Sequence, residues 1–274
     1  IINGVTKSGG NTVMGGVEVY YQPSSWVADN TPETPDEEFK FEDYAASLGG
    51  PLVKDRLWYF LSGEYWHQES TPFGAVDTSD RKIPRVLGKL TWQANPDNRL
   101  FLMTEYDAVT NERRGIDGST LPEATSKQEA PGMSLSLGWE SLIDSANFTN
   151  VRLTGYDGRD DYLPYNGHDL PGRIDEDSGL AWVNQDIQEL NYRRIVTLDG
   201  SWSLFVDDLF GAEDAHTFKF GALYEDAVSS DRWERNGGFT YYDDSTLCPG
   251  DTEEEQIANY LKDPTCGWYE RSTG

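Results

Sequence analysis

The sequence lacks any run of about 18 consecutive apolar residues, the length that a membrane-spanning helix needs. This absence excludes a helical membrane protein, but a membrane-spanning strand is only half apolar and stays compatible with the sequence. Positive charge is also scarce, because 22 Lys and Arg residues stand against 48 Asp and Glu residues, for a net charge of −26. A surface this acidic favours cations and basic partners, and it argues against a nucleic-acid binder, which needs clustered positive charge.

Catalytic motifs are absent as well. The sequence contains no GxSxG, HExxH or P-loop pattern. The three histidines, His67, His168 and His216, share no spacing, and scattered polar surface positions explain them best. A hydrolase that uses two carboxylates needs two acids on neighbouring strands, and no pattern pairs the many acids in this way. The sequence therefore predicts a protein that is not an enzyme.

Only two cysteines are present, Cys248 and Cys266, and they lie close together in one acidic segment. An even pair within a single loop favours a disulfide in an oxidising compartment. Metal binding is the weaker alternative, because no CxxC spacing or nearby histidine accompanies the pair. No initiator methionine and no signal peptide precede Ile1, so we expect that the natural N-terminus lies further upstream.

Aromatic residues are abundant on an otherwise polar chain: they make up 13% of the residues, while the mean hydropathy is −0.64. Apolar and polar residues alternate with a period of two in many segments, which indicates β-strands rather than helices. Apolar positions of this kind include Val17, Val19, Leu100, Leu102, Leu135, Leu137, Val196 and Leu198. The alternation fits the lipid-facing strands of a membrane barrel and also the half-buried strands of a soluble β-sandwich.

Strand length and loop order favour the barrel. Segments without strong breakers are longer than the roughly 5–6 residues of soluble strands, and they reach the roughly 9–11 residues that cross a membrane. They lie at 98–110, 145–158, 189–206 and 215–229. Short connections (50–55, 95–98, near 143–144 and 207–214) alternate with long polar ones (22–40, 68–82, 111–130, 159–188 and 230–267). This order is expected when the long loops lie outside the cell.

We therefore expect an all-β fold, an antiparallel transmembrane β-barrel of which this chain supplies about nine or ten strands. The tenth strand would begin at Trp268. An open sheet edge in hydrocarbon leaves backbone groups unpaired, at a cost of several kcal/mol each. The barrel interpretation thus predicts that the chain is a part of a larger barrel, cut off before closure.

Two motifs resemble TonB-dependent outer-membrane transporters. Residues 2–11, INGVTKSGGN, are similar to the end of the plug domain in that family, and residues 15–21, GGVEVYY, to the first barrel strand. Residues 46–60, ASLGGPLVKDRLWYF, resemble the second hairpin, with a tight turn expected at the Gly-Gly-Pro segment, 49–51. The ordered pair of motifs is typical of the Oar-like branch, and it covers mainly the first sixty residues.

The resemblance implies a Gram-negative outer-membrane transporter in which residues 1–11 end the plug domain and residues 12–274 form the first part of the barrel. It implies contact with outer-membrane lipid and energy coupling to the TonB complex through a region that this chain does not contain. The transported substrate would be a metal chelate, an oligosaccharide, a peptide or a protein, and the loops would also suit surface protein partners. The alternative class is a secreted or surface β-sandwich that binds carbohydrate or protein through exposed aromatics.

Charged residues on the polar faces of the strands are the candidate site residues. In a barrel they project into the lumen, where they face substrate or plug, or else solvate the inner wall and pair with one another. They are Glu18, Glu64, Lys89, Glu105, Asp107, Arg152, Asp199 and Lys219.

No resident cofactor is expected, with calcium in the extracellular loops as the one exception considered. Oxygen ligands for calcium gather at Asp157, Asp160, Asp161, Asp175 and Asp177. These residues form two groups, at 157–161 and at 175–177, and neither follows the order of an EF-hand loop. A solvated acidic loop is therefore the competing interpretation.

Overall fold

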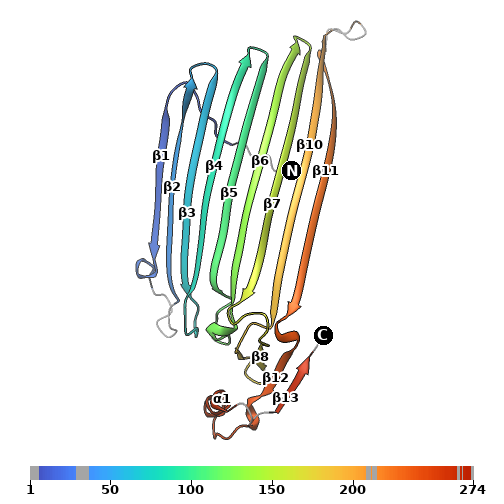
Figure 1. Ribbon diagram of the computed structural model, residues 1–274. Helices are drawn as coiled ribbons and strands as arrows, with labels where there is room; N and C mark the ends of the chain where they lie inside the picture. The colour runs from blue at the N-terminus through green and yellow to red at the C-terminus, as the bar shows by residue number, and fades with distance from the viewer. Residues whose placement is uncertain are drawn as a thin grey trace.

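The computed structural model describes residues 6–28, 37–207, 211, 215–263, 266 and 268–272. Within them, nine long antiparallel strands form one curved sheet, and four short strands form a smaller sheet at one of its ends (Figure 1). The large sheet has the order β1-β2-β3-β4-β5-β6-β7-β10-β11, so each strand pairs with the next one along the chain except where the small sheet intervenes. No helix in the described residues is long and apolar enough to cross a membrane.

The large sheet contains β1 (Met14–Pro23), β2 (Glu38–Val53), β3 (Leu57–Thr71), β4 (Ser79–Asn95), β5 (Asn98–Arg114), β6 (Ser126–Asp144), β7 (Asn147–Pro164), β10 (Ile187–Asp207) and β11 (Ala215–Arg235). The small sheet contains β8 (Arg173–Asp175), β9 (Ala181–Trp182), β12 (Thr240–Asp244) and β13 (Trp268–Ser272). The helices are α1 (Glu253–Lys262) and the short 3-10 helices η1 (Ser24–Trp26), η2 (Pro122–Ala124), η4 (Asn236–Gly238) and η5 (Ser245–Leu247).

Long strands joined by alternating short and long connections were expected, and the structure confirms both features. Strands β10 and β11 each contain 21 residues, and β3, the shortest of β2 to β7, contains 15. Short turns follow β2, β4 and β6 at one end of the sheet, the top in Figure 1, and the long connections lie at the other end. We call these the turn end and the loop end.

The turn expected at the Gly-Gly-Pro segment, 49–51, is wrong. These residues lie within β2 and pair with β3. The chain reverses a few residues later, at Asp55, whose φ of 62° lies in the left-handed region that Asp tolerates in turns. A Gly-Gly-Pro sequence is a strong turn signal, but here Gly50 meets a requirement for close packing against Val13, which is described below.

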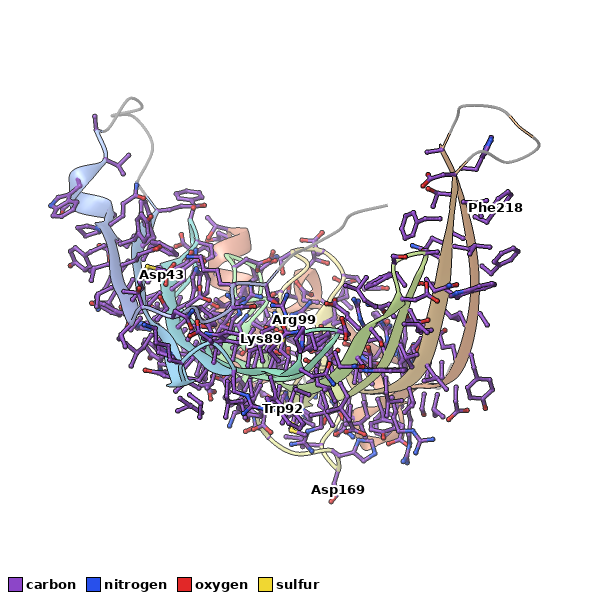
Figure 2. The ribbon with its side chains drawn as sticks, turned by 90° about the horizontal axis from the view of Figure 1, so that it is seen from above. Asp43, Lys89, Trp92, Arg99, Asp169 and Phe218 are labelled. Carbon is purple, nitrogen blue, oxygen red and sulfur yellow. A yellow bond between two sulfur atoms is a disulfide. The ribbon has the colours of Figure 1, made fainter. Side chains whose placement is uncertain are left out.

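The convex face of the large sheet is apolar. One register row runs across seven strands and consists of Tyr59, Leu90, Leu102, Leu137, Leu153, Leu198 and Tyr224. Trp92, two residues from Leu90 and therefore on the same face, lies on the convex side in Figure 2. Leu102 is 38% exposed and Leu198 is 47% exposed, so no second protein layer covers this row among the described residues.

Aromatic side chains border the apolar band of the convex face. Trp92, Trp139 and Trp202 lie toward the turn end, and Tyr44, Tyr65 and Tyr106 toward the loop end. On β4, the register of Tyr65 falls at Pro84. Residues 84–92 thus separate the two borders, which agrees with the roughly 9–11 residues of a membrane-crossing strand. An apolar band between two aromatic belts is the expected outer surface of a membrane barrel.

The two edges of the large sheet, β1 and β11, do not pair with each other within the described residues, so the sheet is an open part of a barrel. The tenth barrel strand expected from Trp268 is wrong, because β13 pairs with β12 in the small sheet. The reason is local. Strand β12 follows β11 after residues 236–239 only, and its free edge lies at the loop end, where β13 meets it.

The loop-end subdomain, residues 165–186 and the described residues of 236–272, holds the small sheet and helix α1 (Figure 1). The predicted disulfide between Cys248 and Cys266 is confirmed, with a Cα–Cα distance of 5.0 Å. It brackets α1 and ties both flanks of the helix together. The sequence predicted a long acidic loop here and not a folded unit.

Candidate functional site

The crossing segment, residues 6–13, runs over the concave face near the turn end and leads into β1. Two side chains of the wall fasten it. Lys89 Nζ donates a hydrogen bond to Thr6 Oγ1 at 2.9 Å, and Trp58 Nε1 donates to Asn11 Oδ1 at 2.8 Å. Because Lys89 belongs to β4 and Trp58 to β3, the segment spans more than one strand of the wall.

Glycines let the crossing segment approach the wall closely. A Cβ atom on Gly9 would lie 2.1 Å from the carbonyl oxygen of Tyr59, which is far inside van der Waals contact. A Cβ atom on Gly50 would lie 3.2 Å from the Cα atom of Val13. The backbone of the segment therefore packs directly on the backbone of β2 and β3, and only glycine fits at Gly9.

A cationic pocket of about 390 Å³ lies on the concave face beneath the crossing segment. Lys89, Arg99 and Arg152 line it, and Figure 2 shows Lys89 and Arg99 on the concave side. Lys89 Nζ and Arg152 Cζ lie 5.5 Å and 5.9 Å from the ring centre of Phe101. This ring lies over Gly138, where a Cβ atom would come within 2.0 Å of it.

The cationic pocket can hold an anionic group. Three cations gathered in a chain of net charge −26 are a local reversal of the overall field, and one carboxylate, Glu140, also lines the pocket. Carboxylate and phosphate groups are the partners that such a cluster attracts.

A second pocket, of about 350 Å³, lies on the concave face between the crossing segment and strands β1 to β5. Glu18, Glu64 and Glu105 line it, with Lys7 and Arg85 as the opposing cations. Arg85 Nη1 lies 3.0 Å from Glu64 Oε2. Close to it, one buried carboxylate oxygen of Asp43 has no hydrogen-bond partner among the described residues.

A third pocket, of about 530 Å³, lies on the concave face nearer the loop end, between β5 and β11. Its lining includes the four carboxylates of Asp107, Asp160, Glu189 and Asp231, against two arginines, Arg159 and Arg193. The concave face is therefore negative toward the loop end and positive near the turn end. A path along the face would take a solute past carboxylates first and cations afterwards.

The loop-end subdomain is held by a buried polar network around Asp243. Arg173 donates two hydrogen bonds to this carboxylate, at 3.0 Å from Nε and 2.6 Å from Nη2, and the Tyr260 hydroxyl donates a third. Trp182 Nε1 donates to the Tyr260 hydroxyl at 3.0 Å. Burial, and then the bond to Asp243, raises the pKa of Tyr260 far above its usual range. The bond to Asp243 also raises the pKa of Arg173.

A second buried carboxylate, Asp175, ties β8 to the segment after β12. It accepts from the backbone N–H of Ser245 at 2.7 Å and from the Ser245 hydroxyl at 2.8 Å, and it also accepts from Ser178. Burial pushes the pKa of Asp175 upward, but the hydrogen bonds from Ser178 and Ser245 outweigh it and hold the pKa below its ordinary value. These acids are structural parts of the subdomain.

All eight charged residues predicted to face the lumen lie on one face of the large sheet, the face that carries Asp43, Lys89 and Arg99 in Figure 2. Lys89 and Arg152 line the cationic pocket, and Asp199 pairs with Arg152 in the register. Lys219 lies apart from the pockets, on β11 opposite Ser203. The part that these residues play in transport stays a prediction.

The five aspartates considered for calcium do not form one group. Asp160 and Asp161 are neighbours on β7 and therefore point to opposite faces of the sheet. Asp157 accepts from the Tyr192 hydroxyl at 2.7 Å, Asp175 is buried in the small sheet, and Asp177 is exposed. Calcium at these positions stays a prediction.

Three groups of residues in the structure were not predicted from the sequence. Arg99, Glu189 and Asp231 fall on the polar faces of their strands, so the alternation that found the other pocket residues could have found them. Thr252 caps helix α1 by accepting from the backbone N–H of Glu255, and the spacing Thr-x-x-Glu is a recognised sign of a helix start. The third group, around His67, depends on contacts between three strands and is taken up below.

The comparison with family models agrees with the fold. Residues 5–82 match the outer membrane beta barrel domain family. The chain is 25% identical to the TonB-dependent transporter Oar of Myxococcus xanthus over a region that covers 36% of this chain and 13% of that protein. The siderophore receptor PirA from Acinetobacter baumannii matches 86% of this chain with 43% of its own length, at 14% identity and a TM-score of 0.47.

The matched regions are thus minor parts of both relatives, of which one is described as a transporter and the other as a receptor. The family match concerns outer-membrane β-barrel proteins, and the open nine-stranded sheet has the apolar outer face that such proteins need. The chain is part of an outer-membrane β-barrel of a Gram-negative bacterium and is similar to TonB-dependent transporters.

Proposed function

We propose that this chain forms the first part of the barrel wall of a TonB-dependent transporter, which carries its substrate over the concave face. Residues 1–11 end the plug domain in this proposal, and residues 12–274 form barrel strands and their extracellular loops. The TonB complex contacts a region that this chain does not contain. The observation that carries the proposal is the crossing segment, which passes from the concave side of the sheet directly into β1.

The exposed convex face favours a membrane-spanning transporter and argues against the alternative, a surface β-sandwich. A sandwich buries one apolar face under a second sheet. Here Val86 is 58% exposed and Leu61 is 52% exposed, and both lie on the convex face. Such a face is stable against lipid, whereas in water it would be a large adhesive patch.

The order of charges along the concave face supports a substrate that carries positive charge on its outer parts. Carboxylates of Asp107, Asp160 and Asp231 lie on the loop side of the cationic pocket, so a substrate that arrives from the loops meets them first. Among the substrate classes considered, a basic peptide or a protein with a basic surface fits this pocket better than an anionic oligosaccharide does. The cationic pocket beyond it offers a place for an anionic group of the substrate or of the plug.

Transport is tested by comparing what cells remove from their medium. Strains that lack the protein and strains that lack TonB are grown beside the parent, and the spent media are compared by untargeted mass spectrometry. We expect the same solutes to remain in the media of both mutant strains. Identical depletion by the parent and by the strain without the protein would rule out the proposed uptake.

The charge argument is tested with a triple variant, Asp107→Asn with Asp160→Asn and Asp231→Asn, in the restored strain. Uptake of the identified solute should fall while the amount of folded protein in the outer membrane stays the same. Asp177→Asn, an exposed position in the loop-end subdomain, is the matched control and should leave uptake unchanged. Equal uptake by the triple variant and the control would contradict the role of these carboxylates.

A further inference from the structure

A histidine with a carboxylate at each ring nitrogen lies near the loop end of β3. The side chain of His67 is only 10% exposed. Its Nδ1 atom lies 2.9 Å from Glu42 Oε2 on β2, and its Nε2 atom lies 2.8 Å from Asp80 Oδ1 on β4. Glu69, two residues further along β3, places Oε1 at 3.7 Å from the same Nε2 atom. Three adjacent strands therefore meet at one imidazole.

A neutral imidazole cannot satisfy this arrangement. It carries one N–H group, so it donates to one carboxylate and turns a lone pair toward the other. A lone pair at 2.8 Å from a carboxylate oxygen is repulsive. When Nδ1 donates to Glu42, the contact between Nε2 and Asp80 therefore needs a cation, and a metal ion can supply it.

The two lysines near His67 do not occupy the position between its Nε2 atom and the carboxylate of Asp80. Lys40 Nζ lies 3.0 Å from Glu42 Oε2, and Lys82 bonds to Asp80 through Oδ2. The other oxygen of Asp80, Oδ1, is the one that faces His67. Both lysines thus neutralise charge around the cluster without occupying the position between Nε2, Oδ1 and the Glu69 carboxylate.

The geometry fits a metal ion with three protein ligands. Among the described residues, His67, Glu69 and Asp80 are the one group whose ligand atoms all lie within 4.8 Å of one another. Two ligands of a tetrahedral zinc ion, each at about 2.0–2.1 Å from the metal, stand about 3.3 Å apart. The two distances from Nε2, 2.8 Å to Asp80 and 3.7 Å to Glu69, bracket this value.

The carboxylate of Glu42 supports the same reading. Metal-bound histidines usually donate their other ring N–H to a carboxylate, which fixes the tautomer and the direction of the ring. Glu42 stands in that position at Nδ1, so Nε2 is left to bind the ion. An imidazole ligand favours zinc and similar transition metals over calcium and magnesium, which prefer oxygen alone.

We propose that His67, Glu69 and Asp80 form a binding site for a divalent transition-metal ion such as zinc, with Glu42 as the positioning residue and a fourth coordination position open to water. In the register, His67 shares the face of Tyr59 and Leu61, so the site lies on the convex side, beyond the aromatic border at Tyr65 and away from the concave pockets. The ion would join β3 and β4 at the loop end, and Glu42 on β2 would reach it only through His67. This role is separate from the proposed transport path.

The test uses the intact outer-membrane protein, purified in detergent, stripped of metal with a chelator and titrated with Zn²⁺ alone. We expect one tight site per chain by calorimetry, and a tetrahedral visible absorption spectrum when Co²⁺ replaces Zn²⁺. His67→Ala should abolish the site, with at least a 100-fold loss of affinity. Glu42→Gln should keep the stoichiometry and weaken binding about 10- to 100-fold.

Two variants keep the test decisive. His168→Ala removes an exposed histidine with only one carboxylate near it, 3.7 Å away, and should leave Zn²⁺ binding unchanged. If His67→Ala does not fold, Glu69→Gln replaces it, because the side chain of Glu69 is 41% exposed and lies 3.7 Å from the His67 ring without a closer ion-pair partner among the described residues. An absent site in the unmodified protein, or equal binding by the unmodified protein and the ligand variants, would overturn the proposal.

Discussion

The convex face of the large sheet exposes its leucines, whereas the loop-end subdomain buries even its charged side chains. Leu198 on β10 is 47% exposed, while Tyr260 and Asp175 in the subdomain are fully buried. Few apolar side chains are buried anywhere in the described residues, and they include Ile83, Ile116 and Tyr260. The two regions therefore take their stability from different sources.

The difference follows from the solvent that each region meets. A sheet in lipid needs all its backbone groups paired and its outer side chains apolar, so it needs no apolar interior. A small folded unit in water cannot bury enough apolar surface by itself, and disulfides commonly compensate for this. Here the disulfide between Cys248 and Cys266 and the network around Asp243 fill that role.

Removing the centre of the polar network should give the largest effect in the comparison. Asp243→Ala leaves the partly buried Arg173 without its carboxylate, and breaking such a pair costs about 3–5 kcal/mol. The subdomain should then unfold locally while the large sheet stays intact. Hydrogen exchange of β8 and β12 measures the loss, with exposed Asp177→Ala as control. Equal protection in both variants would contradict the role given to Asp243.

The second-largest loss of stability is expected from a charge placed on the convex face. Leu102→Arg should cost roughly 2–4 kcal/mol near the middle of the membrane, whereas Glu105→Arg, three residues away on the concave face, should be mild. Unfolding in urea from lipid vesicles measures both variants. A similar loss at the two positions would mean that the two faces are not distinguished by lipid.

Loss of the disulfide should destabilise the loop-end subdomain alone. Cys248→Ser combined with Cys266→Ser opens a loop with a sequence separation of 18, for which the chain-entropy model gives about 3 kcal/mol. Limited proteolysis should then cut between α1 and the flanking segments, and the rate of unfolding of the large sheet should not change. Faster unfolding of the large sheet would show that the two regions are coupled.

Alkaline pH should weaken the subdomain before the sheet. Burial and the bond to Asp243 raise the pKa of Tyr260 above the ordinary value of 10.0. Its contribution is fully present below pH 10 and is lost as the pH rises further, at roughly 1 kcal/mol per pH unit. Protection of β12 from hydrogen exchange, corrected for the intrinsic rate, should fall above pH 10 in the unmodified protein. A flat profile there would contradict the buried state of this phenol.

The smallest effect expected is at the start of α1. Thr252→Ala removes the side chain that accepts from the backbone N–H of Glu255 at 3.2 Å, at a cost of about 1 kcal/mol. Exchange of the amides in the first turn of α1 should speed up, while β12 stays protected. Thr252→Ser, which keeps the hydroxyl, should behave like the unmodified protein. A variant Thr252→Ala with unchanged exchange would show that this cap contributes nothing.

The large sheet could be predicted from the sequence because one face of each strand meets lipid and the other meets water. Apolar and polar residues therefore alternate with a period of two. Leu102 and Glu105 were assigned to opposite faces from their parity on one strand, and the register agrees. The Gly-Gly-Pro segment misled because glycine serves both turns and close packing, and the sequence does not show the crossing segment lying against Gly50.

The small sheet and the group around His67 could not be predicted from the sequence. Strands β8 and β9 contain three and two residues, too few for an alternation to be seen. His67 and Glu69 are two residues apart on one strand, but Glu42 and Asp80 reach them only through the registers of β2 and β4 with β3. Such contacts depend on strand pairing, which the sequence alone does not specify.

The most direct test of the central claim measures which side chains of β5 touch lipid. Nitroxide labels are placed one at a time at residues 100 to 105 of the intact protein in vesicles, and collision with oxygen and with a water-soluble nickel chelate is measured. Labels at 100, 102 and 104 should favour oxygen, and labels at 101, 103 and 105 the nickel chelate, with a strict period of two. Uniform accessibility along the strand, or the opposite phase, would contradict the account.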